Sequence, residues 1–562
     1  MDFILALHSH LPYVLHHGRW PHGSDWLCEA ALDTYLPLLD MLQTFERDGI
    51  DTPVTLGITP VLANQLAHPS FREELEAYFA HRLEACDVAP ASLAATGDAE
   101  LVPLAAYWRR RLSALRDVYH ASGSDLIGAF RGLQDRGRLE LISSAATHGF
   151  LPMLGRDESI RLQLFTGRAE HRRLFGRAPD GCWLPECAFR PAGPWQPRDA
   201  KPVAHRRGTD EHLRDAGYRF FFVDAHLVAA GDNLGAYHDV PLGAERFDAE
   251  RHDPDTPPMK VPLGAKRSPY RAYRMPGPRG AAPLAAFVRD PRSSMQVWSR
   301  QQGYPGDEWY LEFHKIRWPG GLKLWRVTSG DADLGAKRSY DPDRARGRAR
   351  EHARHFASLL HQTARQEQGG RVIVAPFDTE LFGHWWFEGV DFLGDLYRSL
   401  GTEPGAARPV VARAHDAGQS RGSVVTLAEG SWGANGDFSM WSNEQTAWTW
   451  QRLWPLEDAF WALAPAALKG DARQRLVLAQ AARSLLLAQS SDWQFIISTG
   501  AATDYAERRF VLHADDAEHL VAALKPEASA GALEEAVRYA EGIRPRDDLF
   551  PDVLDSIAEA LG

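Results

Sequence analysis

The sequence is poor in cysteine, with 4 among 562 residues, and it contains no apolar run close to the ~18 residues that a membrane-spanning helix requires. So few cysteines exclude a disulfide framework and favour reduced thiols, so we expect a cytoplasmic protein. The apolar residues at the amino terminus follow no basic segment and precede no small-residue cleavage site. We therefore expect no signal peptide.

Positive charge is not in excess either. The 63 Lys and Arg residues are outnumbered by 74 Asp and Glu residues, which gives a net charge of −11. This balance argues against nucleic acid or an anionic membrane as the main partner. A chain of this length is too long for one compact core, and we expect two or three domains in a monomer or a small homo-oligomer.

Aromatic residues, by contrast, are abundant, with 18 Trp, 25 Phe and 15 Tyr. Many of the tryptophans stand beside Gly, Asn, His or acidic residues and not in periodic core patterns. Any single Trp is still a core residue by default, but rings in these settings also suit a groove in which they stack on sugar faces.

Short apolar runs, each ending in a polar motif, recur through the first ~400 residues, with amphipathic helical stretches between most of them. Alternation of this kind predicts an α/β fold with a parallel sheet. Because the polar residues always follow the strand, we favour a barrel of the triosephosphate-isomerase kind, left incomplete by its seven units, whose chemistry lies at the carboxyl ends of its strands. A doubly wound open sheet would give a similar pattern, but no Gly-rich phosphate motif follows any strand. The seven runs are residues 3–7, 54–58, 139–143, 181–184, 219–223, 284–288 and 372–375.

Two segments differ from the barrel in composition and in the periodicity of their apolar residues. Residues 68–132 are rich in Ala, Leu, Glu and Arg and predict an inserted helical subdomain, and residues 405–562 predict a carboxyl-terminal helical domain. The catalytic barrel then comprises residues 1–67 and 133–404. A long excursion rich in Pro and Gly covers residues ~232–300, and we expect Tyr237 to lie in an active-site lid.

Two carboxylates at the ends of apolar runs are the main candidates for catalysis. Glu186 lies in GCWLPECAF and Asp378 in VIVAPFDTELFGHWW, so both stand among aromatic residues. A charged group is costly there unless it is paired or used, and paired acids are what glycoside chemistry needs. We predict Glu186 as nucleophile, against a buried ion pair with Arg190, and Asp378 or Glu380 as general acid/base.

The segment HSH places His8 and His10 on one face of a strand. We weigh three interpretations: recognition of sugar hydroxyls, a structural role at the strand end, and a metal-dependent hydrolase. In the polar-aromatic patch SSDW, Asp492 either caps a helix or reaches the cleft, and a cap is the simpler expectation. Further ligands for the metal would be His148, Asp224, His226 and Asp378.

Five motifs together resemble glycoside hydrolase family 57, and most closely its 1,4-α-glucan branching enzymes. They are HSHLPY (8–13), ATHGF (146–150), WLPECAF (183–189), FDTELFGHW (377–385) and QSSDW (489–493). The resemblance covers nearly the whole chain and implies a distorted (β/α)7 barrel with a helical insertion and a carboxyl-terminal helical domain. It implies a retaining mechanism without a metal or cofactor, with Glu186 as nucleophile and Asp378, rather than Glu380, as acid/base.

The resemblance also implies an α-1,4-glucan substrate and formation of α-1,6 branches. An α-amylase-like hydrolase and a 4-α-glucanotransferase remain the alternatives with the same catalytic pair, and a non-catalytic glycan-binding protein is a more distant one. The residues that match substrate-binding positions of the family, or are placed there by local similarity, are His8, His10, Trp20, His148, Tyr237, Trp298, Trp432, Trp441 and Asp492.

Overall fold

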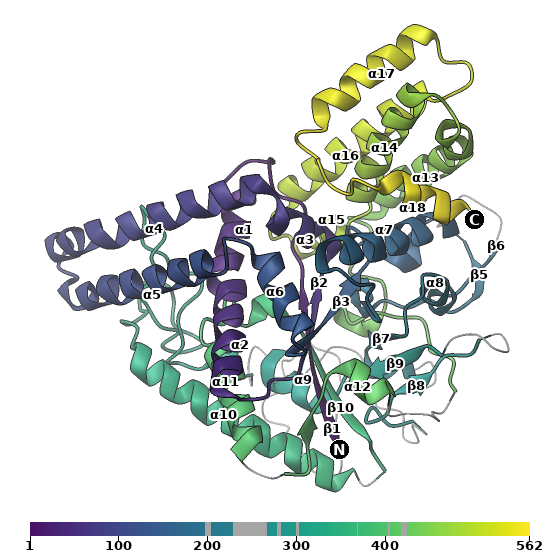
Figure 1. Cartoon of the computed structure of the whole chain (residues 1–562). Helices are drawn as coiled ribbons and strands as arrows, with labels where there is room; N and C mark the ends of the chain where they lie inside the picture. Colours follow the sequence, from purple (N-terminus) through teal and green to yellow (C-terminus); the bar gives the residue numbers. More distant parts are fainter. Residues whose placement is uncertain are drawn as a thin grey trace.

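The computed structural model describes residues 1–196, 204–228, 267–277, 283–298, 303–367, 369–402, 405–417 and 424–562. Tyr237 and its expected lid lie outside these residues. A curled parallel sheet lies at the centre of the molecule, with a pair of long helices projecting to one side and a bundle of helices above it (Figure 1).

Seven parallel strands form the sheet, in the spatial order β10-β1-β2-β3-β4-β7-β9. The backbone N–H of Asp290, just after β9, donates to the carbonyl of Val374 in β10 at 2.8 Å, so the two ends of the sheet meet. This arrangement confirms the predicted distorted barrel of seven strands. The strands are β1 (Asp2–Ser9), β2 (Val54–Ile58), β3 (Leu139–Ser144), β4 (Gly181–Trp183), β7 (Phe220–Val223), β9 (Ala285–Val288) and β10 (Val372–Asp378).

Nearly every residue of these strands is buried, because helices cover the outside of the barrel and side chains fill its interior. Two short strands extend the sheet: β8 (Tyr273–Arg274) pairs antiparallel with β9, and β11 (Arg408–Pro409) pairs with β1. The covering helices are α2 (Leu36–Asp48), α3 (Pro60–Ala67), α6 (Leu126–Asp135), α7 (Asp157–Phe175), α8 (Thr209–Asp215), α9 (Pro291–Trp298), α10 (Pro342–Gln366) and α11 (Gly389–Thr402).

The projecting pair consists of α4 (Pro69–Thr96) and α5 (Val102–Ala121), within the region expected to be helical (Figure 1). The third helix of that region, α6, packs on β3, α3 and α7 and so belongs to the covering of the barrel. A long connection, residues 303–341, runs between α9 and α10 and is fastened to the projecting pair. Arg82 donates to the Gly320 carbonyl and Trp108 to the Lys323 carbonyl, each at 2.6 Å.

The helices of the carboxyl-terminal bundle begin at Ala447, and residues 408–412 before them pack on the barrel. There β11 pairs with β1, and the N–H of Ala412, at the start of α12 (Ala412–Ala417), donates to Thr55 in β2 at 2.9 Å. Within the described residues, no helix is both long and apolar enough to cross a membrane. The bundle consists of α13 (Ala447–Leu468), α14 (Ala472–Ala488), α15 (Ser491–Thr499), α16 (Thr503–Ala523), α17 (Ala530–Ile543) and α18 (Val553–Leu561).

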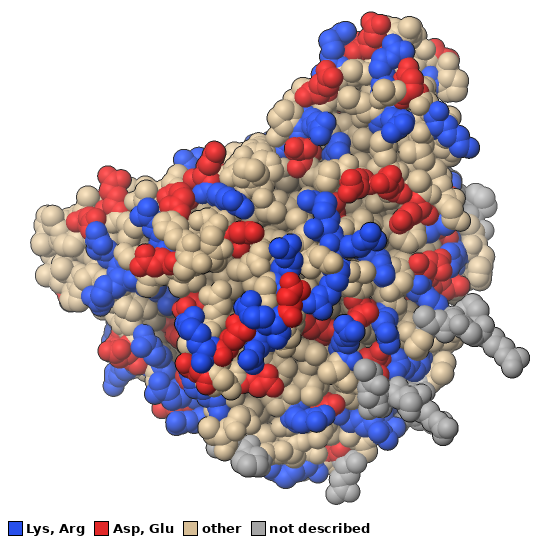
Figure 2. Space-filling model, viewed as in Figure 1, with Lys and Arg blue, Asp and Glu red and all other residues tan. Residues whose placement is uncertain are grey.

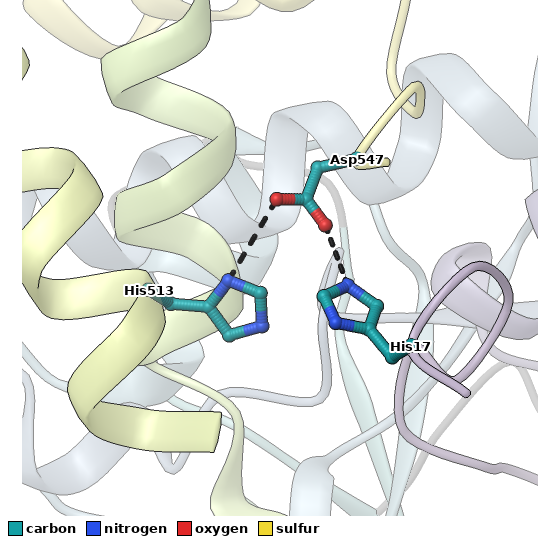
Figure 3. A group of neighbouring side chains, drawn as sticks. All are labelled: His17, His513 and Asp547. Carbon is teal, nitrogen blue, oxygen red and sulfur yellow. Dashed lines mark hydrogen bonds and ion pairs between the residues drawn. The ribbon is translucent and has the colours of Figure 1, made fainter. Parts of the chain in front are cut away.

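A buried polar joint ties the bundle to the barrel (Figure 3). His17, on the loop after β1, lies 2.7 Å from Asp547, which follows α17, and His513 of α16 lies 4.0 Å from the same carboxylate. Arg546 also binds Asp547, at 2.6 Å. Burial lowers the pKa of His17 to about 4, although Asp547 opposes this effect, so the imidazole is neutral near pH 7. The charge of Asp547 is then balanced by Arg546.

Removing the carboxylate at this joint is expected to destabilise the protein. In Asp547→Asn, His17 and Arg546 lose a charged acceptor while Arg546 keeps its second partner, Asp516, so we expect a loss of about 1.5–3 kcal/mol. The matched control is Asp548→Asn, because Asp548 pairs with Arg544 at 3.5 Å and both of these side chains are about half exposed. Thermal unfolding measures both variants, and equal midpoints would contradict a structural role for Asp547.

Candidate active site

The two candidate carboxylates both lie at the carboxyl end of the barrel. Glu186 follows β4 in the 3₁₀ turn Pro185–Cys187, and its backbone is left-handed, with φ of 59°. Asp378 is the last residue of β10, and strand pairing sets it beside His8 of β1. His148, after β3, is also left-handed, with φ of 58°. Non-glycine residues adopt this conformation at a cost of order 1–3 kcal/mol, and such residues cluster at functional sites.

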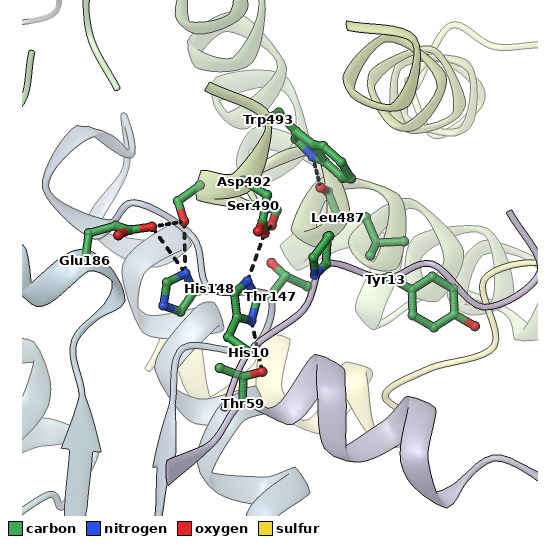
Figure 4. A network of polar contacts seen from close by, with 12 residues as sticks. His10, Tyr13, Thr59, Thr147, His148, Glu186, Leu487, Ser490, Asp492 and Trp493 are labelled. Carbon is green, nitrogen blue, oxygen red and sulfur yellow. Dashed lines mark hydrogen bonds and ion pairs between the residues drawn. The ribbon is translucent and has the colours of Figure 1, made fainter. Parts of the chain in front are cut away.

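Glu186 is held by hydrogen-bond donors from two separate segments. The indole N–H of Trp432 donates to Oε2 at 3.0 Å, and the hydroxyl of Ser491 donates to Oε1 at 3.0 Å. His148 Nδ1 lies 3.7 Å from Oε1 (Figure 4). The side chain is 15% exposed, so it is sheltered but can be reached. The alternative interpretation of Glu186, a buried ion pair with Arg190, is wrong, because Arg190 donates to the Pro152 carbonyl at 3.3 Å instead.

The surroundings of the two carboxylates differ in a way that separates their protonation. Burial raises the pKa of Glu186 to about 7, although donation from Trp432 and Ser491 opposes the rise. Burial also raises the pKa of Asp378 well above its ordinary value, and the charges of Glu380 and Glu186 add to the rise. Glu186 has two donors that favour its ionised form, whereas Asp378 has none among the described residues. Glu186 therefore ionises first, and Asp378 keeps its proton.

Three imidazoles stack beneath this pair. The ring of His8 lies 4.6 Å from that of Trp183, nearly parallel to it, and the rings of His10 and His148 lie 4.0 Å apart. His8 and His148 also approach each other through their Nε2 atoms at 3.0 Å. Burial lowers the pKa of His8 and of His148 well below the ordinary value, so both are neutral and offer one donor and one acceptor each.

Asp492 binds His10 across the junction between the bundle and the barrel (Figure 4). Its Oδ2 lies 2.9 Å from His10 Nε2 and accepts from Ser490 at 2.5 Å, while His10 Nδ1 lies 3.0 Å from Thr59. Burial alone would raise the pKa of Asp492, but His10 holds it below the ordinary value. The expected helix cap is wrong, because Ser490 occupies the cap position of α15 and the Asp492 carboxylate faces His10.

The metal hypothesis finds no support in this geometry. The rings of His8, His10 and His148 stack on one another, and His226 binds the Gly436 carbonyl at 2.7 Å. Two other groups of three possible metal ligands in the described part of the chain come close enough to share an ion. In each of them a basic side chain, Arg546 or Lys323, already pairs with a carboxylate of the group. These groups are His17–His513–Asp547 and Glu29–Asp33–His384.

The predicted tryptophans separate into three settings. The indole of Trp432 binds Glu186. The ring of Trp298 lies edge-on to the Trp432 ring, with centroids 6.1 Å apart, so these two rings line the site. Trp441 is only 1% exposed and stacks on Phe150 at 4.6 Å. Its expected place on a cleft surface is therefore wrong in this structure, since close packing makes it part of the core. Trp20 is 68% exposed and lies on the outer surface.

Three residues at the site escaped the sequence analysis. Ser491 donates to Glu186 and lies 2.9 Å from His148 Nδ1, and only its place inside the SSDW patch pointed to it. Tyr35 donates to Glu380 at 2.5 Å, and the backbone N–H of His10 donates to the same carboxylate at 3.1 Å. Arg289, after β9, lies 3.4 Å from Asp224 and 5.5 Å from the Trp432 ring. Long sequence separation hides all of these contacts.

The indole of Trp432 is expected to set the pH dependence of the site. Trp432→Phe removes a hydrogen bond to the ionised form of Glu186, so the pKa of Glu186 rises. Because a nucleophile must be ionised, the acidic limb of the kcat/KM profile should move up by about one pH unit. Trp454→Phe is the matched control, since it loses an indole hydrogen bond to the Met153 carbonyl instead. An unshifted acidic limb would contradict the assigned role of Trp432.

A parallel barrel with two partly buried acids, neutral imidazoles and tryptophans at the carboxyl ends of its strands defines a carbohydrate-active enzyme of the barrel class. Residues 4–407 match the family model described as glycosyl hydrolase family 57. Residues 453–556 match the model of the 1,4-alpha-glucan branching enzyme C-terminal domain. The chain belongs to glycoside hydrolase family 57.

Relatives with this architecture align with almost the whole chain. A 1,4-alpha-glucan branching enzyme of Thermococcus kodakarensis is 39% identical over 98% of this chain and 77% of its own length. The crystal structure of a family 57 branching enzyme from Pyrococcus horikoshii superposes with a TM-score of 0.87 at 36% identity, covering 99% of this chain and 96% of that one. The alpha-amylase AmyC of Thermotoga maritima superposes with a TM-score of 0.77 at 29% identity, covering 99% of both chains.

Proposed function

We propose that this protein is a 1,4-α-glucan branching enzyme that cleaves an α-1,4 bond and transfers the released segment to a sugar 6-hydroxyl. The observation that carries the proposal is the composite nature of the site. Ser491, which donates to Glu186, lies inside the region that matches the branching-enzyme C-terminal model. The helical bundle thus contributes directly to the candidate nucleophile.

In the first step, ionised Glu186 attacks the anomeric carbon while Asp378 gives its proton to the departing O4. The glycosidic C–O bond breaks as the bond to Glu186 forms, giving a covalent glycosyl-enzyme. In the second step, Asp378 takes the proton of an acceptor 6-hydroxyl, whose oxygen displaces Glu186. Two inversions leave the anomeric configuration retained. We keep His8, His10 and His148 as proposed substrate-binding residues; the neutral His8 and His148 bind each other through Nε2, and His148 Nδ1 binds Ser491.

Exclusion of water decides between transfer and hydrolysis, because both use the same glycosyl-enzyme. Trp298 and Trp432 form an apolar wall beside Glu186, which favours an oriented sugar over water. We keep Tyr237, outside the described residues, as a proposed lid residue, and Trp20 and Asp492 as proposed substrate-binding residues. A hydrolase is the second candidate, favoured by the overall similarity to an alpha-amylase.

Incubation of the purified protein with amylose tests the proposal. Iodine staining, reducing ends and the α-1,6 anomeric proton signal are followed together. Branching predicts falling iodine colour and a growing α-1,6 signal with few new reducing ends. Many reducing ends without an α-1,6 signal would identify a hydrolase, and loss of iodine colour without either change would identify an α-1,4 transferase.

A further inference from the structure

A hairpin in the connection between α9 and α10 carries two aromatic contacts at the protein surface. Bridges between Leu311 and Arg326 and between Arg317 and Leu322 define it, and we call it hairpin 311–326. Near its tip, Trp318 is 57% exposed and lies edge-on to Trp20, with ring centroids 5.6 Å apart. Near its base, the ring of Phe313 lies 4.6 Å from that of Trp385.

Trp385 is exposed although its neighbours are not. Its side chain is 53% exposed, whereas His384 and Trp386 on either side are 5% and 1% exposed. The backbone of this segment is fixed, because the N–H of Trp385 donates to the carbonyl of Glu380 at 3.1 Å. Glu380 lies two residues after Asp378. The Phe313–Trp385 pair is therefore anchored to the segment that carries the proposed acid/base.

A buried ionic cluster fixes the base of the hairpin. Lys323 is 5% exposed and pairs with Glu29 at 3.0 Å and with Asp33 at 3.1 Å. Its ammonium group also lies 5.0 Å from the centroid of the Phe313 ring, and Asp33 lies 3.9 Å from His384. Asp33 belongs to the π-helix Ala31–Tyr35, a kind of distortion found frequently at functional sites. A buried pair adds little net stability, so the main effect of this cluster is to set the position of the rings.

We infer that hairpin 311–326 binds one α-1,4-glucan chain, which runs from the Phe313–Trp385 pair beside the active site to the Trp20–Trp318 pair at the tip. The identity of the ligand rests on the proposed function. Phe313 and Trp318 are five residues apart, so an extended chain separates them by at most about 17 Å. The site therefore accepts chains of several glucose units and favours long donors or acceptors over short ones.

A glucan fits these rings better than a protein partner does. His314, Lys315 and Arg317 lie between the two pairs, and the His314 side chain is 74% exposed. The exposed rings thus stand apart among polar groups, whereas a stable protein interface buries about 800 Å² per partner around a continuous apolar centre. Separated flat rings with polar side chains between them suit a ligand that presents alternating C–H faces and hydroxyl groups.

The inference is tested by binding and by kinetics of Trp318→Ala. In the inactive Glu186→Gln background, the affinity for amylose, measured by electrophoresis in gels that contain it, should fall about five- to tenfold. In the active enzyme, the ratio of kcat/KM for amylose to that for a short malto-oligosaccharide should fall by a similar factor. Leu334→Ala is the control, because Leu334 is 50% exposed on the same connection. Trp385→Ala should weaken binding of both long and short glucans.

Three outcomes would overturn the inference. If the parent binds amylose and Trp318→Ala binds it equally well, the hairpin is not a glucan site, while the proposed function stands. If the parent binds no amylose, the proposed function and the inference fail together. If Trp318→Ala instead changes the oligomeric state in light scattering with its amylose affinity unchanged, the rings contact a second copy of the chain.

Discussion

Replacing Glu186 by Gln should abolish turnover of amylose, lowering kcat by at least about 10⁴-fold while leaving glucan binding intact. The amide is nearly isosteric: its carbonyl oxygen still accepts from the Trp432 indole, and its NH2 group donates to the Ser491 hydroxyl, which reverses only that one hydrogen bond. It cannot form the covalent glycosyl-enzyme, because its oxygen carries no negative charge. The measurement is the initial rate of the iodine assay, paired with binding in amylose gels.

A second variant tests the nucleophile separately from general damage. Glu186→Ala leaves room for azide, which would attack the anomeric carbon directly and give a glycosyl azide of inverted configuration.

The matched control for Glu186→Gln is Glu457→Gln. Glu457 is another buried carboxylate whose pKa burial raises to about 7, but it binds Gly155 and Gln489 away from the Glu186 carboxylate. An active Glu186→Gln enzyme would end the assignment of this residue as nucleophile.

Asp378→Asn should lower kcat on amylose by about 10²–10⁴-fold, the usual contribution of a general acid. The loss should depend on the leaving group, because Asp378 acts in the first step only by protonating the departing oxygen. With an α-maltosyl fluoride donor, whose fluoride leaves without protonation, formation of the glycosyl-enzyme should be nearly as fast as in the parent. Single-turnover kinetics with both donors measure this difference.

The pH profile gives an independent check on Asp378. In the parent, the basic limb of kcat/KM reports loss of the proton that burial and the charges of Glu380 and Glu186 hold on Asp378. Asp378→Asn should remove this limb and leave the acidic one. Glu380→Gln is the comparison, because Glu380 is already bound by Tyr35 and His10 and should keep both limbs. If Asp378→Asn lost the same factor in rate with amylose as with α-maltosyl fluoride, a general-acid role for Asp378 would be excluded.

Strand ends were the part of this structure that the sequence predicted best. A buried strand needs a continuous apolar run, and a catalytic residue must follow the run, so β4 with Glu186 and β10 with Asp378 can both be read locally. The same reasoning places His8 and His148 at the site. The resemblance of five short motifs to family 57 then supplied roles that spacing alone left open, such as the choice between Asp378 and Glu380.

Contacts between distant segments could not be predicted in this way. Trp432 and Ser491 lie 246 and 305 positions from Glu186 in the sequence, and no local pattern reveals contacts over such separations. Asp492 looked like a helix cap because acidic residues favour that position, yet its pairing with His10 outweighs the local preference. Trp441 stands in a loop motif much like that of Trp432, and only packing against Phe150 distinguishes a core ring from a cleft ring.

The hydrogen bond from Ser491 to Glu186 also carries a consequence for biosynthesis. Its two residues are 305 positions apart, and the amino-terminal part of a chain leaves the ribosome first. The barrel strands are therefore all synthesised before α15 exists, and during that interval Glu186, the proposed nucleophile, lacks one of its two donors. A ribosome-bound chain that ends before α15 should be inactive on glucans, so that translation itself delays activity until the last domain has folded.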